Sequence, residues 1–122
     1  ARGIFASAAS VVELKEEMMD AVTAVSGSGP AYVFFLVEQM VRAGVELGLT
    51  PEQAHQLATQ TALGAAQMLT TSADTPAELR RKVTSPGGTT LAAITHMEQH
   101  GMAQIVVDAL KAAARRSHEL GK

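Results

Sequence analysis

The chain has 122 residues, a net charge of −2 at neutral pH and no cysteine. This length suits one domain, the scattered charges offer no basic face for nucleic acid, and the lack of cysteine excludes disulfides and thiolate metal sites and fits a cytoplasmic location. Hydrophobic residues make up 47% of the sequence but aromatic residues only 3%, so the core must consist of small aliphatic side chains, which suit closely packed helices.

The first residues have the pattern of the end of another domain. Residues 1–9 resemble the end of a helix, and Val11, Val12 and Leu14 outline a short strand. A lone strand is not stable, and no other segment has a strand pattern. We therefore expect residues 1–16 to be a remnant, the last helix and strand, of a nucleotide-binding domain, with a frayed helical leader as the alternative. Residues 17–122 are predicted to form an all-α domain.

A short helix at residues 17–25 leads into Ser-Gly-Ser-Gly-Pro at 26–30. The glycines predict a break, with Ser28 as a candidate N-cap of the next helix and Pro30 at an early helical position. The stretch lacks the lysine of a phosphate-binding loop and follows no strand, so we interpret it as a turn.

The helix predicted for residues 30–47 is apolar on nearly every face. Apart from Gln39, its polar residues are Glu38, Arg42 and Glu46, which lie four apart on one stripe. Such a helix lies either at the centre of its domain or against a second subunit. We favour the second subunit and predict a homodimer. The longest apolar run, residues 31–37, is too short to span a bilayer, so no membrane contact is expected.

Caps and prolines predict the next two helices. Thr50 as N-cap and Pro51 at the first position open a helix that runs to about residue 71, on which His55 is interpreted as a solvated residue. Thr75 and Glu78 have the spacing of a capping box and open a short helix that ends near residue 83.

A glycine loop that runs into a helix occupies residues 83–93. A proline and two glycines exclude a helix over its first half, and Thr89 and Thr90 are predicted to cap a helix that reaches about residue 100. Free N–H groups and the helix dipole at this start favour an anion, with an ordinary capped helix as the alternative. Three cations precede the loop: Arg80, Arg81 and Lys82. An ordinary solvated helix face would explain Arg80 and Arg81 equally well.

Gly101 is predicted to end that helix, and an amphipathic last helix follows from Met102. His96 and His100 have a spacing that metal sites use. Two imidazoles without a third ligand are more often incidental, so no metal is expected.

Two blocks of the sequence together resemble pyrroline-5-carboxylate reductase. Residues 21–32, Ala-Val-Thr-Ala-Val-Ser-Gly-Ser-Gly-Pro-Ala-Tyr, and residues 83–90 are similar to the C-terminal half of that family. Read from Pro76 to Glu98, the second block fits the family signature. The resemblance extends over the whole chain.

The resemblance implies an oxidoreductase of proline biosynthesis, which reduces 1-pyrroline-5-carboxylate to L-proline with NADPH or NADH. It implies a Rossmann domain for the cofactor and a helical domain that interlocks two subunits, with the active site between the two domain types of different subunits. It also implies that the Thr90 hydroxyl is the catalytic group that meets the ring nitrogen. The implied substrate-binding residues are Ser85, Gly87, Gly88, Thr89 and Thr90.

The chain contains no G-x-G-x-x-G turn after a strand, so we expect the cofactor to be bound mainly by a domain that is absent here, and the chain alone to be inactive. The choice between NADH and NADPH and the assembly above the dimer stay open. One rival is a non-catalytic helical dimerisation module. Another is the helical domain of a β-hydroxyacid dehydrogenase, whose catalytic lysine setting is not found at any lysine of the chain: Lys15, Lys82, Lys111 or Lys122.

Overall fold

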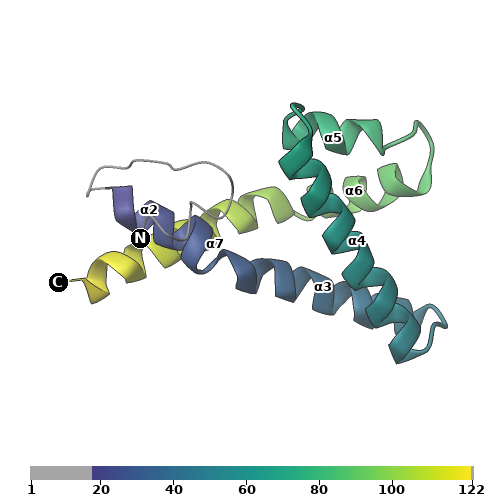
Figure 1. The fold of residues 1–122 in the computed structure, drawn as a ribbon, viewed down its shortest axis with the longest axis horizontal. Helices are drawn as coiled ribbons and strands as arrows, with labels where there is room; N and C mark the ends of the chain where they lie inside the picture. Colours follow the sequence, from purple (N-terminus) through teal and green to yellow (C-terminus); the bar gives the residue numbers. More distant parts are fainter. Residues whose placement is uncertain (1–17, 122) are drawn as a thin grey trace. The chain divides into compact units, whose positions relative to one another are not determined.

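The computed structural model describes residues 18–121, which form helices and contain no strand (Figure 1). The predicted all-α class is confirmed for these residues, and the remnant predicted for residues 1–16 lies outside them. The described chain divides into two units, residues 31–105 and residues 18–30 with 106–121. In chain order the elements are α2 (Met19–Val22), the π-helical turn η2 (Thr23–Gly27), α3 (Gly29–Glu46), α4 (Pro51–Thr71), α5 (Pro76–Lys82), α6 (Thr89–Gln99) and α7 (Met102–Leu120).

In the unit of residues 31–105, a glycine turn joins α3 to α4. Gly48 has a φ of 111°, a left-handed conformation that glycine adopts without strain. The Gly48 N–H donates to the Val45 carbonyl and the Leu49 N–H to the Gly44 carbonyl, each at 3.0 Å. These two bonds form a Schellman motif, which satisfies carbonyls at the end of a helix.

The start of α4 confirms the prediction from the sequence. Thr50 is the N-cap and its Oγ1 accepts a hydrogen bond from the Gln53 N–H at 3.1 Å, while the Thr50 N–H donates to Gln53 Oε1 at 3.0 Å. Pro51 begins the helix. This reciprocal capping box satisfies two N–H groups at the helix start, so the boundary of α4 is set locally.

α3 and α4 approach closely where Gly44 faces Ala54. A Cβ placed on Gly44 would lie 3.0 Å from the Ala54 Cβ and 3.3 Å from Leu49 Cδ1. On α4, Ala54 and Ala58 are only 3% and 5% exposed. Small residues on both helices therefore allow the two backbones to meet.

We expect Gly44→Ala to lower the free energy of unfolding by roughly 1 kcal/mol. Overpacking costs about 1–3 kcal/mol, which exceeds the roughly 1 kcal/mol gained from the better helix propensity of alanine. Urea unfolding followed by circular dichroism would measure this change. Gly64→Ala, in the interior of α4, is a matched control, since nothing lies within 4 Å of a Cβ placed there. A Gly44→Ala chain at least as stable as the wild type would show that α4 shifts without cost.

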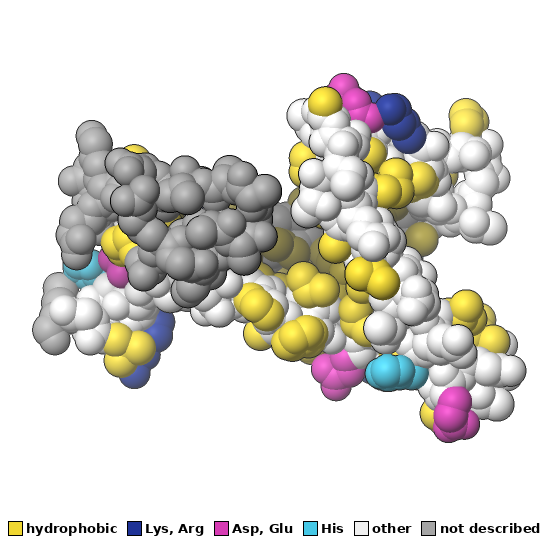
Figure 2. Space-filling model, in the orientation of Figure 1, with side chains coloured by type: hydrophobic (Ala, Val, Ile, Leu, Met, Phe, Trp, Pro, Cys, Tyr) yellow, Lys and Arg dark blue, Asp and Glu magenta, His cyan; other side chains and the backbone are white. Residues whose placement is uncertain are grey.

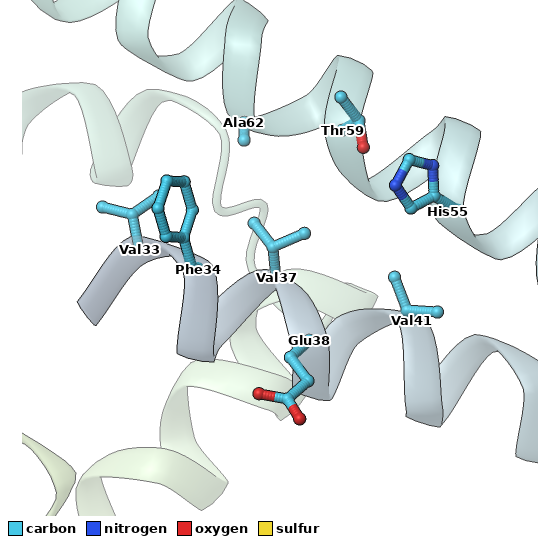
Figure 3. Close-up of a pocket in the computed structure, with 8 residues that line it drawn as sticks. All are labelled: Val33, Phe34, Val37, Glu38, Val41, His55, Thr59 and Ala62. Atoms are coloured by element: carbon cyan, nitrogen blue, oxygen red, sulfur yellow. The ribbon is translucent and has the colours of Figure 1, made fainter. Parts of the chain in front are cut away.

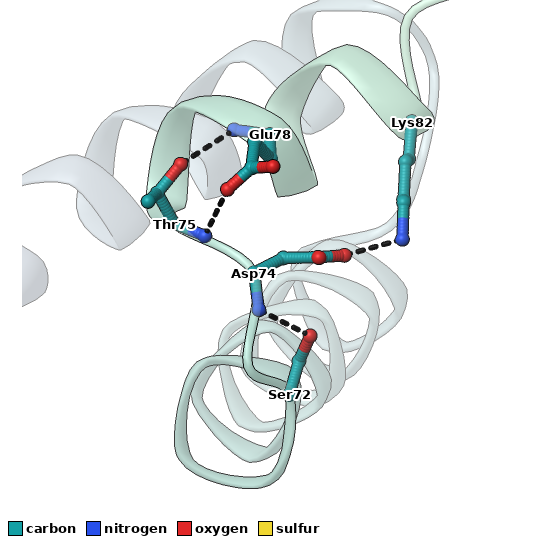
Figure 4. Close-up of polar contacts among 5 residues, drawn as sticks. All are labelled: Ser72, Asp74, Thr75, Glu78 and Lys82. Atoms are coloured by element: carbon teal, nitrogen blue, oxygen red, sulfur yellow. Dashed lines mark hydrogen bonds and ion pairs between the residues drawn. The ribbon is translucent and has the colours of Figure 1, made fainter.

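Polar side chains hold the connection between α4 and α5 (Figure 4). Ser72 Oγ accepts a hydrogen bond from the Asp74 N–H at 3.0 Å, and the Lys82 ammonium pairs with the Asp74 carboxylate. The predicted capping box is confirmed, because the Glu78 N–H donates to Thr75 Oγ1 at 3.2 Å and the Thr75 N–H donates to Glu78 Oε1 at 2.8 Å. Both ends of this short connection are therefore fixed by neighbours in sequence.

The hydrogen bond from the Thr75 backbone N–H, and then that from its side chain, stabilise the Glu78 carboxylate and lower its pKa below the ordinary value. A group whose pKa is lower in the folded state stabilises the fold above its unfolded pKa, and this contribution is lost as the pH falls through the folded pKa. Below about pH 4 we therefore expect the melting temperature to drop less for Glu78→Gln than for the wild type, because glutamine keeps an acceptor that does not titrate. Identical acid profiles of the two chains would contradict this expectation.

In the other unit, the predicted break at residues 26–30 is a single bend residue, Ser28, between η2, which ends at Gly27, and α3, which begins at Gly29; the predicted N-cap role of Ser28 is wrong. The Ser28 N–H donates to the Thr23 carbonyl at 2.8 Å, which closes a π-helical turn. Ser28 has φ −88° and ψ −12°, which is right-handed helical geometry and not the extended geometry of an N-cap. The interruption between η2 and α3 is therefore confined to one residue. Pro30 lies near the start of α3, as predicted.

Asp20 connects α2 to the end of α7 within this unit. Its Oδ1 accepts a hydrogen bond from Ser117 Oγ at 2.8 Å, and its Oδ2 lies 3.2 Å from His118 Nδ1. Ala24, in the π-helical turn, is 2% exposed. Segments far apart in the sequence therefore meet here.

The described residues bury few apolar side chains. Among them, only Ala24, Ala54 and Ala58 are buried. Larger apolar side chains lie at the surface, as Figure 2 shows along α3 and α4, and the exposed fraction is 70% for Phe34 and 65% for Phe35. Within the described chain, α3 is not a buried central helix, which removes one of the two alternatives that the sequence left open.

The helical stretch Met19–Glu46 has 28 residues and, by length and composition alone, is long and apolar enough to cross a membrane. It is longer than the apolar run of residues 31–37 because α2, η2 and α3 follow one another with only Ser28 between η2 and α3. A helix whose apolar faces are covered by a second subunit can have the same length and composition as a helix that crosses a membrane.

Candidate functional site

The loop between α5 and α6 begins with two hydrogen bonds from one residue. The Thr84 N–H donates to the Arg81 carbonyl at 3.1 Å, and Thr84 Oγ1 donates to the Arg80 carbonyl at 2.6 Å. Both bonds satisfy carbonyls at the end of α5. The side chains of the two arginines are exposed, and Lys82 pairs with Asp74 at the α4–α5 connection.

Ser85 to Gly88 form a tight turn. The Gly88 N–H donates to the Ser85 carbonyl at 3.0 Å, and Gly87 has a φ of 69°. Proline at the second position and glycine with positive φ at the third define a type II turn. A Cβ placed on Gly88 would lie 3.2 Å from the Ser85 carbonyl oxygen, so a larger residue would be crowded there.

The N-cap of α6 is Gly88, with an extended φ of −89° and ψ of −179°. The prediction that Thr89 and Thr90 cap this helix is therefore wrong. They occupy its first helical positions, and no side chain makes a capping hydrogen bond. The reason is the type II turn, which places the extended geometry of a cap at Gly88, before the threonines are reached.

The start of α6 presents free donors. The first bond of the helix runs from the Ala92 N–H to the Gly88 carbonyl at 3.2 Å, so in the described part of the chain the N–H groups of Thr89, Thr90 and Leu91 have no carbonyl partner. The Thr90 hydroxyl also has no protein partner among residues 18–121, and Thr90 is half-buried. Free N–H groups at the positive end of a helix dipole suit an anion.

A groove of about 430 Å³ runs from this loop along α6. Gly87 and Gly88 line it, whereas the other predicted site residues, Ser85, Thr89 and Thr90, do not. The remaining lining residues were not predicted, although their helical spacing places them on one face: Leu91, Ala92, Thr95, His96 and Gln99.

His96 and His100 contact each other on α6. Their ring centroids are 4.2 Å apart, and His100 Nδ1 lies 2.8 Å from the His96 carbonyl oxygen. Within residues 18–121 no group of three or more His, Cys, Asp or Glu side chains could hold a metal ion. The spacing of the two histidines is thus explained by contact between them and with the backbone.

A second hollow, of about 540 Å³, lies between α3 and α4 (Figure 3). His55 is exposed, as predicted, but it also lines this hollow, while the Glu38 carboxylate is turned away from α4. A large, mainly apolar hollow with few converging polar groups suits the packing of another polypeptide. Its lining consists of Val33, Phe34, Val37, Glu38, Val41, His55, Thr59 and Ala62.

Comparisons with known proteins agree on one family. The model of the family described as "Pyrroline-5-carboxylate reductase dimerisation" matches residues 16–120. Pyrroline-5-carboxylate reductase of Synechocystis sp. is 48% identical over 122 residues, which are 100% of this chain and 46% of that protein. The Pseudomonas aeruginosa protein of the same name is 57% identical over 107 residues, 88% of this chain and 39% of that protein.

Among solved structures, Plasmodium falciparum pyrroline carboxylate reductase with NADP bound is similar to this chain with a TM-score of 0.85 and 36% identity. The match covers 91% of this chain and 45% of that one. The chain therefore spans less than half the length of these relatives.

Proposed function

This chain belongs to the pyrroline-5-carboxylate reductase dimerisation family, and from that membership we propose that it is the dimer-forming and substrate-binding part of a reductase that converts 1-pyrroline-5-carboxylate to L-proline with NAD(P)H. The observation that carries the proposal is the 48% identity, over the whole chain, to the pyrroline-5-carboxylate reductase of Synechocystis sp.. The free donors at the start of α6 support it independently.

The substrate carboxylate is proposed to bind at the start of α6. There the N–H groups of Thr89, Thr90 and Leu91 lack carbonyl partners in the described chain, and the helix dipole adds partial positive charge. Gly87 and Gly88 hold the backbone of the turn in the shape that brings these donors together, and the exposed Ser85 lies at its start. A carboxylate matches this set of donors in charge and hydrogen-bonding character.

The Thr90 hydroxyl is proposed to meet the ring nitrogen of the substrate. It has no protein hydrogen-bond partner among the described residues, so it is available to a ligand. Reduction of an imine needs a positioned substrate and stabilisation of the nitrogen, and it needs no nucleophilic side chain. In this proposal the chain orients the substrate, and Thr90 stabilises the nitrogen.

The cofactor is proposed to bind mainly outside this chain. A dinucleotide site needs a glycine-rich turn between a strand and a helix, whereas the described residues contain no strand and the sequence has no such motif. The described residues therefore do not form a dinucleotide-binding site. The Plasmodium falciparum relative was solved with NADP bound, and NADPH or NADH would supply the hydride.

A dimerisation domain implies a homodimer, and we propose that this one is obligate and interlocked. The exposed aromatic side chains of α3 and the apolar hollow beside α4 support this, because both would be covered by a second subunit. Association of these dimers into a larger oligomer stays open. A cytoplasmic location is also proposed, on the absence of cysteine.

An assay of NADPH or NADH oxidation tests the proposed reaction. The complete protein that contains this chain should oxidise NADPH or NADH only when 1-pyrroline-5-carboxylate is supplied, with L-proline as the product by mass spectrometry. Residues 1–122 alone should show no turnover. If the folded complete protein consumes neither cofactor, the reductase proposal is wrong and the non-catalytic dimerisation module becomes the better hypothesis.

Binding of L-proline to the chain alone should be weak and local. A helix terminus contributes only roughly 0.3–1 kcal/mol toward an exposed charge, too little to hold a small acid without the rest of a pocket. In an NMR titration, amide shifts should cluster at Gly87 to Thr90 and be absent with prolinamide, which has no carboxylate. Shifts confined to other segments would remove this loop from the site.

A further inference from the structure

A charged stripe crosses the exposed aromatic surface of α3. Arg42 Nε lies 3.1 Å from Glu46 Oε2, with the two side chains 74% and 67% exposed. Glu38, one turn earlier, has no ion-pair partner among the described residues, and its carboxylate is turned away from α4 (Figure 3). By helical spacing it is a neighbour of both Phe34 and Phe35, which are 70% and 65% exposed.

An unpaired carboxylate among exposed aromatic rings is costly to bury unless a cation meets it. Arg42 is suited to that role in a second copy of the chain. Its guanidinium uses Nε toward Glu46, and its other N–H donors make no hydrogen bond within residues 18–121, so they can contact a further carboxylate. One arginine could thus bridge Glu46 of its own helix and Glu38 of another copy.

Two-fold symmetry decides the direction in which the two helices would cross. In a closed homodimer the same surface is used by both subunits. A parallel crossing on the axis would place Glu38 against Glu38 of the second copy, with like charges opposed. An antiparallel crossing on this face, with the axis level with position 40 along the helix, places each Glu38 opposite Arg42 of the other copy, twice by symmetry. The same register brings Val45, 40% exposed, opposite Phe35.

We propose that α3 crosses the dimer axis antiparallel to its own copy, with Glu38 of each subunit paired to Arg42 of the other. This inference rests on the proposed homodimer and goes beyond it, since it names the helix at the axis, its direction and the ion pairs that set its register. Charge complementarity of this kind determines which partners and registers are accepted.

Charge reversal tests the pairing. Glu38→Arg and Arg42→Glu should each weaken self-association by at least about tenfold, because like charges would then meet across the axis. When the two variants are co-expressed with different tags, mixed dimers should greatly exceed the random share. The double variant E38R/R42E restores complementary charges and should self-associate like the wild type. Glu46→Gln, which removes only the pair within the helix, is the matched control and should leave the dimer unchanged.

Native mass spectrometry of the tagged mixtures and circular dichroism of every variant give the readout. Random mixing of tags, with wild-type dimers intact, would overturn the α3 pairing and leave the proposed dimer standing. A folded monomeric wild type would overturn the dimer itself. If a single variant does not fold alone, recovery of folded mixed dimers supports the pairing, and failure of both the mixture and the double variant contradicts it.

Discussion

On the proposed function, replacing Thr90 by alanine in the complete protein that contains this chain should lower kcat/KM by roughly ten- to a hundredfold. A hydrogen bond with one charged partner contributes roughly 1.5–3 kcal/mol, and about 1.4 kcal/mol corresponds to a tenfold change in rate. Thr90→Val keeps the shape of the side chain without its hydroxyl and should behave like Thr90→Ala. Thr90→Ser keeps the hydroxyl and should lose much less. Steady-state kinetics with varied pyrroline-5-carboxylate would measure each effect.

The position of Thr90 makes these variants easy to interpret. Because Gly88 is the N-cap of α6 and no side chain caps the helix start, loss of the Thr90 hydroxyl removes no capping hydrogen bond. The melting temperatures of the variants should therefore stay close to that of the wild type, which separates chemistry from stability. If Thr90→Ala and Thr90→Val both keep near-native kcat/KM, the hydroxyl has no role and the loop acts through its backbone N–H groups alone.

The second prediction with a large expected effect concerns the assembly of this chain into dimers. We expect sedimentation at low micromolar concentration to show dimers and no folded monomer. The described chain buries only three alanines and exposes the rings of Phe34 and Phe35 on α3, so a monomer would have too little core. Obligate interfaces bury on the order of 2,000–5,000 Å², and an interlocked pair of helical domains would reach this range.

Dilution gives a direct check on this expectation. Loss of helical signal should coincide with loss of the dimer, since folding and association are one process in an obligate dimer. A compact monomer that keeps its helical circular dichroism after dilution would show that the exposed apolar surface is tolerated without a partner. The second subunit would then be ruled out as the source of the missing core.

The helix boundaries that were predicted correctly depend on residues close in sequence. Thr50 with Gln53 and Thr75 with Glu78 make reciprocal bonds over one turn, so their spacing alone determines where α4 and α5 begin. Gly101, with a φ of 80°, follows the end of α6 for a similarly local reason. Such signals are complete within a few residues and need no information on the rest of the fold.

The N-cap predictions at two helix starts failed because the residue types that cap helices also occur in turns and inside helices. Thr89 and Thr90 have the composition of caps, yet the type II turn places the cap at Gly88. Ser28 has the composition of a cap, yet the π-helical turn keeps it in helical geometry. In each case the choice depends on how the preceding backbone is bonded, and composition does not report this.

By itself the sequence determined the all-α class, the bounds of the helices with strong caps, and the residues of the glycine loop, because these follow from backbone geometry over a few positions. It also indicated that α3 needs a partner, since its polar residues fill only one stripe. Only the tertiary structure decided that α4 leaves the apolar side of α3 uncovered, that a groove joins the loop to one face of α6, and that Glu38 is turned away from α4. These features depend on the distances between helices, which arise from packing such as that of Gly44 on Ala54 and not from the pattern of any single helix.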